Sequence, residues 1–536
     1  MRTFRGALND TGLATTKSRP LKSRRWIYVP YDQLTLALGP LAREDREELG
    51  VVLVESVAKA KRRPYHKQKL ALVLANMRHF AVECAAKGIA VRYEATAGGY
   101  ADVLAALTKE LGTIRVMEPA ERELREELAP LFESGALECI EHEGWLTTAE
   151  QFERAAPNGP PWRMDRFYKI VRNDTGILMD DDKPVGGKYS HDADNRNPWK
   201  GKPAAPDLPS FRPDAITKEV GALVEEKFAD HPGKLDLSSL PANHRDALRM
   251  WRWARESCME HFGPYEDAMS TASRNLFHTR VSHLINVHRL LPKQVVDDVL
   301  ALDIPLASKE GFVRQVIGWR EFVRHVHVAT DGFRSLDGRT VPVNGAGDAT
   351  PSFLRGRTEL PAAFWDTKSG LRCLDTVVES VWDEAYSHHI TRLMILSNLG
   401  TLLDLTPRAL TDWFWVAYHD AYDWVVEPNV LGMGLFAAGD IMTTKPYVSG
   451  AAYIDRMSDY CGECTFHPKK NCPITRLYWA FLARKEKLLS GNHRVGQAMA
   501  SLRKRSAEKK KEDARVFETV RARLAKGEPV TPEDLD

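Results

Sequence analysis

The run Val51-Val-Leu-Val-Glu55 decides the first part of the fold, because a short apolar run rich in β-branched residues is typical of a strand. Similar short runs recur at residues 26–29, 89–93, 114–117 and 137–140, and segments with apolar residues at helical spacing lie between them. This alternation predicts a doubly wound α/β domain over residues 26–145, with a parallel sheet covered by helices on both faces. Ligands of such domains bind at the carboxyl ends of the strands.

Proline content and charge divide the rest of the chain. Prolines from Pro157 to Pro213 predict a connecting region over residues 146–240, draped over two domains. Helical spacing dominates beyond it, so residues 241–500 are predicted to form a large all-α domain. Residues 1–25 hold seven Arg and Lys against one Asp and predict a disordered basic tail, and residues 501–536 predict a charged C-terminal tail.

Composition narrows the class of protein. The 536 residues carry a formal net charge of only +2, so binding to nucleic acid requires a local basic patch. No stretch approaches the roughly 18 apolar residues of a spanning helix, and we expect no membrane role. Seven cysteines are too few for a disulfide-stapled secreted scaffold, which predicts a reducing cytoplasm.

Four of the cysteines suggest a metal site. Cys461, Cys464 and Cys472 lie within twelve residues, and Cys373 lies 88 residues before Cys461. Four thiolates suit a structural zinc ion as well as an iron-sulfur cluster, so their spacing leaves both open, with unliganded thiols as a third alternative. The other three cysteines are isolated and are predicted to pack as small apolar side chains.

Several motifs carry a family resemblance. Gly318-Trp-Arg-Glu-Phe322 is similar to the WREF element of photolyases and cryptochromes, and Leu276-Phe-His-Thr-Arg-Val-Ser282 resembles their segment around the FAD phosphates. Lys445-Pro-Tyr447, Tyr453-Ile-Asp-Arg-Met-Ser-Asp-Tyr-Cys461 and Gly491-Asn-His-Arg494 are similar to a signature of the iron-sulfur branch. Because the motifs also follow one another in the order that the family has, the chain resembles the iron-sulfur bacterial cryptochrome and (6-4) photolyase family.

The resemblance implies a photolyase/cryptochrome fold with an antenna-type α/β domain and a helical domain that binds U-shaped FAD and a [4Fe-4S] cluster. The cluster ligands would be Cys373, Cys461, Cys464 and Cys472, which favours iron-sulfur over zinc. The implied FAD-binding residues are Tyr265, His278, Thr279, Arg280, Ser282, Gln315, Arg320, Arg392, Asp420 and Asn429. Trp365 and Trp413 match an electron relay, and the implied lesion pocket contains Leu393, Met433, Tyr447 and Tyr453.

The implied chemistry centres on the motif that contains His388 and His389, which the resemblance makes catalytic. His389 lies one turn before Arg392 on a predicted helix, and it matches the proton donor of (6-4) photolyases, where cyclobutane-dimer photolyases generally have asparagine. An unperturbed pKa of about 6.5 suits that step. Arg392 and Asp420 would pair beside the flavin and stabilise its reduced anionic form.

The resemblance therefore implies light-driven repair of UV-induced (6-4) pyrimidine-pyrimidone photoproducts by electron transfer from excited reduced FAD. The expected partner is UV-damaged DNA, and we expect a monomer with no obligate protein partner. The alternative is a cryptochrome-type blue-light photoreceptor without repair activity.

The sequence departs from the family pattern at three places. Phe414 stands where some relatives have a relay tyrosine, and Val426 stands where others place glutamate or asparagine near flavin N5. Glu427 would substitute only if the register shifted by one residue. Relatives hold a 6,7-dimethyl-8-ribityllumazine antenna partly through cysteine and glutamate, which correspond to Val54 and Lys59 here. We expect this antenna pocket to be empty or to hold a different chromophore.

Overall fold

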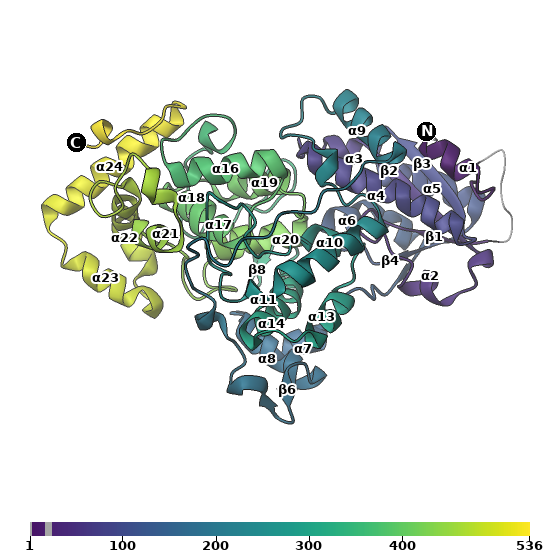
Figure 1. Ribbon diagram of the computed structural model, residues 1–536, viewed down its shortest axis with the longest axis horizontal. Coiled ribbons are helices and arrows are strands. Elements are labelled where there is room, and N and C mark those ends of the chain that lie inside the picture. Colours follow the sequence, from purple (N-terminus) through teal and green to yellow (C-terminus); the bar gives the residue numbers. More distant parts are fainter. Residues whose placement is uncertain (1–2, 17–23) are drawn as a thin grey trace.

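The computed structural model describes residues 3–16 and 24–536, and it places the α/β domain and the C-terminal helices at opposite ends of the long axis (Figure 1). Five strands form one parallel sheet in the order β3-β2-β1-β4-β5. They are β1 (Arg25–Tyr28), β2 (Leu49–Ser56), β3 (Ala90–Thr96), β4 (Ile114–Met117) and β5 (Leu137–Ile140). Each overlaps a run that the sequence predicts, and the predicted fold class is confirmed.

Helices cover both faces of this sheet. All eight residues of β2 are buried, as expected of a strand with a layer on each side. The crossover through α4 (Lys67–Ala86) runs from β2 to β3, whereas the one through α6 (Arg122–Glu133) runs from β4 to β5 in the other direction. Right-handed connections therefore place α4 and α6 on opposite faces, and α5 (Tyr100–Leu111) packs beside α6. The strand order reverses between β1 and β4, and a ligand crevice is expected at their carboxyl ends.

The expected disordered N-terminal tail is wrong for residues 3–16. Helix α1 (Phe4–Asn9) buries Phe4 and Leu8, which are spaced to lie on one helical face. Ala14 then forms a parallel bridge with Val91 of β3. Two large apolar residues among basic ones therefore outweigh the charged composition of this segment. Other basic residues of the expected tail lie outside the described residues, namely Arg2, Lys17, Arg19 and Lys22.

The proline-rich region contains three helices that contact different parts of the molecule. They are α7 (Ala149–Ala155), α8 (Met164–Thr175) and α9 (Ala215–Lys227). Helix α9 packs against α4 of the α/β domain, whereas α8 packs against the helical body. One short hairpin, β6 (Met179–Asp180) with β7 (Lys183–Pro184), also lies in this region. A second, β8 (Ser335–Leu336) with β9 (Arg339–Thr340), lies further along the chain, in the helical body.

The helical body is interrupted by three π-helical segments, η5 (Arg314–Arg320), η7 (Arg392–Ser397) and η8 (Glu427–Gly434). Such segments are rare and often occur at functional sites. The α-helices around them are α10 (His244–Ser257), α11 (Met259–Phe262), α12 (Ser282–Asn286), α13 (Pro292–Ala301), α14 (Leu306–Val313), α15 (Glu321–Ala329), α16 (Arg372–Glu384), α17 (His389–Thr391), α18 (Asn398–Leu402), α19 (Pro407–Ala417), α20 (Asp423–Val426), α21 (Ala451–Met457), α22 (Pro473–Leu489) and α23 (Gly496–Arg503).

The charged C-terminal segment packs onto the helical body and is not a free tail. Helix α24 (Ala507–Ala525) lies along α22 and buries Val516, Phe517, Val520 and Leu524. The guanidinium of Arg484 lies 3.4 Å from the centre of the Phe517 ring, so a cation-π contact strengthens the packing. Among the described residues, no helix combines the length and the apolarity that crossing a bilayer requires.

Candidate cofactor pocket and active site

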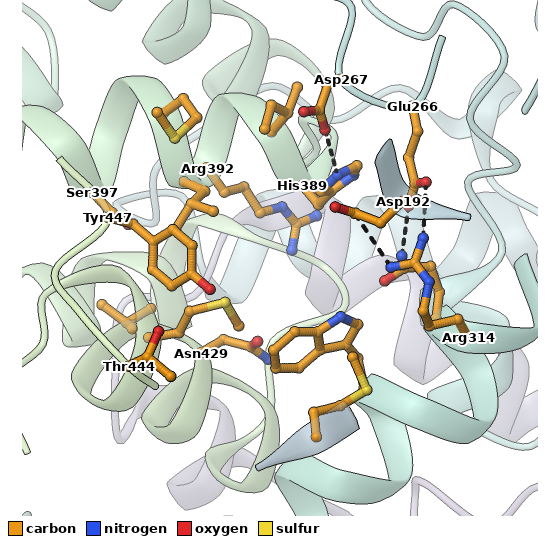
Figure 2. Close-up of a pocket in the computed structure, with 18 of the residues that line it drawn as sticks. Asp192, Glu266, Asp267, Arg314, His389, Arg392, Ser397, Asn429, Thr444 and Tyr447 are labelled. Atoms are coloured by element: carbon orange, nitrogen blue, oxygen red, sulfur yellow. Dashed lines mark hydrogen bonds and ion pairs between the residues drawn. The ribbon is translucent and has the colours of Figure 1, made fainter. Parts of the chain in front are cut away.

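Two adjoining cavities of about 720 Å³ and 270 Å³ open inside the helical body. Figure 2 shows residues around the larger one. All three π-helical segments contribute to its wall, and its volume lies within the roughly 300–1,000 Å³ typical of ligand pockets. Residues shared by both cavities are Gln315, Trp319, His389, Arg392, Asp420, Val425 and Asn429. The two spaces therefore form one continuous candidate site.

A buried ion pair stands between the two cavities. Arg392 Nη1 and Nη2 each lie 3.0 Å from a carboxylate oxygen of Asp420, and Ser282 Oγ donates to the same carboxylate at 2.7 Å. Arg392 Nε also donates to the Ser387 carbonyl at 2.7 Å, which fixes the guanidinium plane. Burial opposes both charges, yet the pair still lowers the pKa of Asp420 and raises that of Arg392. The sequence prediction that these two residues pair therefore agrees with the geometry.

The smaller cavity offers donors for an anionic group. Only 10% of the Arg320 side chain is exposed, and although its Nη1 pairs with Glu321, its Nε and Nη2 atoms have no hydrogen-bond partner among the described residues. Burial lowers the pKa of this guanidinium, and a buried cation with free donors suits a phosphate oxygen. The predicted FAD-binding residues found at this cavity are His278, Thr279, Arg280, Ser282, Gln315, Arg320, Arg392, Asp420 and Asn429. This donor set fits the FAD that the resemblance implies.

Tyr265 lines neither cavity, in contrast to the sequence prediction. Its ring lies 5.3 Å from the ring of Phe277, and its hydroxyl donates to the Lys202 carbonyl at 3.3 Å. These contacts turn the side chain toward a separate small apolar cluster. Contact with FAD is therefore not supported for this residue.

Three histidines meet where the cavities join. The rings of His278 and His388 stack at 4.3 Å, and burial lowers the pKa of both, that of His388 to about 3. Ligand nitrogens of His278, His388 and His389 lie within 4.8 Å of one another. However, nitrogen lone pairs lie in the ring plane, so two parallel rings do not aim at a single ion. We therefore interpret the cluster as part of the ligand pocket and not as a metal site.

His389 differs from its neighbours because 44% of its side chain is exposed and it borders both cavities. Its Nε2 lies 3.7 Å from Asp267 Oδ1 (Figure 2), and the Tyr453 hydroxyl donates to the other oxygen of Asp267 at 3.0 Å. Burial opposes ionisation of Asp267, but the contacts with His389 and Tyr453 lower its pKa on balance. An ionised carboxylate beside an open imidazole suits proton transfer.

The wall of the larger cavity includes all four predicted lesion residues, Leu393, Met433, Tyr447 and Tyr453. Val426 also lines it, whereas Glu427 does not. Glu427 is buried and accepts from Arg408 Nη1 at 2.7 Å, and its other oxygen lies 2.9 Å from His327 Nε2. The alternative in which Glu427 replaces the missing pocket acid is therefore wrong, because its carboxylate is engaged elsewhere.

The four predicted cysteine ligands gather beside the helical body. Cys373 lies in α16, Cys461 and Cys464 lie in or next to the short helix η9 (Tyr460–Glu463), and Cys472 precedes α22. None forms a disulfide. Burial raises the pKa of the Cys373 thiol, and nearby Cys472, Cys461 and Cys464 raise it further, so the fold brings the four thiols together.

Aromatic rings connect the pocket to the surface. The ring of Trp365, which is 37% exposed, stacks on Trp382 at 5.3 Å, and Trp382 lies 5.8 Å from Trp413. Trp413 in turn contacts Phe414 at 5.2 Å and Tyr418 at 6.1 Å, both of which line the larger cavity. The sequence prediction named Trp365 and Trp413 but missed Trp382, which lies between them.

Other site residues were also missed from the sequence. Glu266 and Asp267 project from the loop after α11, and Arg314 lies in η5 (Figure 2). Arg314 Nη2 lies 3.5 Å from Glu266, whose other oxygen accepts from Gln315 Nε2 at 2.5 Å. No sequence motif marks Glu266 or Asp267. Only the fold brings this loop against the helix that begins at His389.

Solved structures share this arrangement of a doubly wound domain and a helical body. A bacterial class III photolyase from Agrobacterium tumefaciens covers 96% of this chain and 98% of its own, with a TM-score of 0.53 and 14% identity. A Synechocystis cryptochrome covers 90% and 98%, with a TM-score of 0.53 and 13% identity. The fold is therefore that of the photolyase and cryptochrome class.

Sequence similarity identifies the family. A family model described as deoxyribodipyrimidine photo-lyase-related protein matches residues 27–239. A (6-4) photolyase from Agrobacterium fabrum is 34% identical over an alignment of 493 positions, which covers 88% of this chain and 94% of that protein. The chain belongs to the bacterial cryptochrome/photolyase family. Its function is accordingly of the photolyase/cryptochrome type, and family membership implies a flavin cofactor.

Proposed function

We propose that this protein is a (6-4) photolyase that repairs UV-damaged DNA in the light. The observation that supports this most directly is His389, which is open to the larger cavity beside the ionised Asp267. When bound and reduced, FAD supplies a light-excited electron to the lesion. A carbonyl-type product of photodamage also needs a proton, which His389 would supply.

The other pocket residues would bind and orient the FAD and the damaged bases. Arg320 would hold a phosphate with its free Nε and Nη2 donors, and Arg392 would place a fixed cation beside the flavin ring. Asp420 keeps Arg392 in position. Tyr447 and Met433 provide apolar surface that excludes water from the extruded bases.

The test is illumination of the reduced holoenzyme with an oligonucleotide that carries one (6-4) photoproduct, followed by measurement of restored thymines. We expect repair in the light and none in the dark. Binding of the lesion without repair would contradict the enzyme and favour the cryptochrome-type photoreceptor. One observation favours that second candidate: Val426 gives the pocket an aliphatic wall where relatives have a polar side chain.

We further propose that the four cysteines bind a [4Fe-4S] cluster, because the fold brings four free thiols together at the positions that the family resemblance assigns to its ligands. The purified protein is expected to contain about four iron atoms per chain and no stoichiometric zinc. Replacing Cys461 with Ala should remove most of the iron, whereas Cys139→Ala, at an exposed and isolated thiol, should retain it. Elemental analysis checks both. Zinc without iron would refute the cluster.

We also propose that Trp382 joins the electron relay between Trp365 and Trp413. Its ring bridges the other two at separations below 6 Å, and such contact favours electron hopping. A Trp382→Phe variant should photoreduce its flavin at least tenfold more slowly in the presence of a soluble thiol. Absorption spectroscopy measures this rate. Trp479→Phe, in helix α22 where the ring contacts Tyr478, is the control, and equal rates for all three proteins would exclude Trp382.

A further inference from the structure

The crevice at the carboxyl ends of β1, β2 and β4 is the place where a doubly wound domain binds a ligand. In this protein it is nearly filled, because the remaining cavity measures only about 70 Å³. Sites for cofactors usually exceed roughly 300 Å³. The lumazine antenna implied by the resemblance therefore does not fit.

Lys59 is the residue that closes this crevice. Its Nζ atom lies 3.0 Å from Glu121 and 2.9 Å from Glu123, and it faces the ring of Tyr31 at 5.5 Å. The Tyr31 hydroxyl also donates a hydrogen bond to Glu121. Only 15% of the lysine side chain is exposed, and Val54 adds an apolar wall. The ammonium of Lys59 and the carboxylate of Glu121 thus occupy the polar end of the crevice.

The residues around Lys59 also join the α/β domain to the helical body. Trp415 and Tyr422 of the helical body complete the cavity wall, and the Glu123 backbone N–H donates to Asp423 at 3.2 Å. Arg63, one turn beyond Lys59, lies 2.6 Å from Glu123 and 2.9 Å from Asp348 of the helical body.

Charge balance makes Lys59 hard to displace. Burial raises the pKa of Glu121, and nearby Asp423 and Glu123 raise it further. The ammonium of Lys59 offsets this accumulation of carboxylates. A neutral chromophore that displaced Lys59 would remove the ammonium from buried Glu121 and leave Glu123 paired with Arg62 and Arg63 alone, which is unfavourable.

We propose that Lys59 is the built-in occupant of the antenna site, and that the α/β domain of this protein binds no second chromophore. The flavin then absorbs the active light directly. The Lys59 cluster takes over the task of joining the α/β domain to the helical body at this position.

The first test is the chromophore content of the purified holoenzyme. Denaturation followed by chromatography should release FAD and no stoichiometric lumazine, deazaflavin or folate. A second chromophore at close to one per chain would overturn the proposal. The measurement needs neither light nor DNA, so its outcome is independent of whether the protein repairs (6-4) photoproducts.

The second test adds 6,7-dimethyl-8-ribityllumazine to the holoenzyme and measures retention by ultrafiltration and fluorescence. We expect no saturable binding to the wild-type protein or to Lys61→Ala, which changes an exposed lysine of the same helix, α3 (Val57–Lys61). The double variant Lys59→Ala/Glu121→Gln removes the lysine from the crevice together with one negative charge, so no excess charge is left. It should retain at least tenfold more lumazine than the wild-type protein. Stoichiometric binding to the wild-type protein would overturn the proposal even if the double variant failed to fold.

Discussion

A His389→Asn variant is expected to repair (6-4) photoproducts at least about 100-fold more slowly than the wild-type protein, because general acid catalysis typically contributes 10²–10⁴. Asparagine keeps a polar side chain of similar size at the cavity wall but carries no transferable proton. Because 44% of the His389 side chain is exposed, the change leaves no large void. The contact with Asp267 is long, at 3.7 Å, so no tight buried ion pair is broken. Repair of a defined oligonucleotide under blue light measures the effect.

Two further measurements separate lost chemistry from lost binding. FAD content and affinity for damaged DNA should stay close to the wild-type values, since the Arg392–Asp420 pair is untouched. His244→Asn is a matched control, because His244 is exposed and lines neither cavity. Repair by His389→Asn at the wild-type rate would remove this histidine as the proton donor.

The sheet could be predicted because local patterns determine it. Each strand is a short run of mainly β-branched, aromatic or other apolar residues between segments with helical spacing, and a parallel strand needs only such a run and a crossover. Helix α1 could not be predicted from composition, because two buried side chains, Phe4 and Leu8, outweigh a basic surrounding sequence. The packing of α24 could not be predicted either, because the charge of residues 501–536 predicted only a charged tail, whereas an apolar stripe of this helix packs on α22.

The candidate site divides in the same way. Residues in contiguous motifs, such as Arg392 and Ser282, were found because their neighbours in sequence identify them. Asp267 and Trp382 belong to no motif, and they matter only because tertiary packing brings them to His389 and Trp413. Tyr265 is the converse case, since this position taken from relatives lines neither cavity here.

Replacing Asp420 with Ala is expected to lower the free energy of unfolding by about 3–5 kcal/mol and to abolish retention of FAD. The reason is that Arg392 would remain as a buried cation without a partner, and breaking one side of a buried pair typically has this effect. Ser282 would also lose the acceptor of its 2.7 Å hydrogen bond. Urea denaturation of the flavin-free protein measures stability separately from cofactor binding.

Asp174→Ala is the matched control, because Asp174 forms a two-point pair with Arg154 of similar geometry at the surface. Solvent screens that pair, so the denaturation midpoint should hardly move.

The dependence of stability on pH provides a second check. The pKa of Asp420 is lowered on folding, so its contribution is complete above the unfolded value of about 3.9 and declines as the pH falls through the lower folded value. The stability difference between wild type and Asp420→Ala should therefore persist at pH 5 and shrink only in stronger acid. Equal midpoints at pH 7 would mean that the pair does not stabilise the fold.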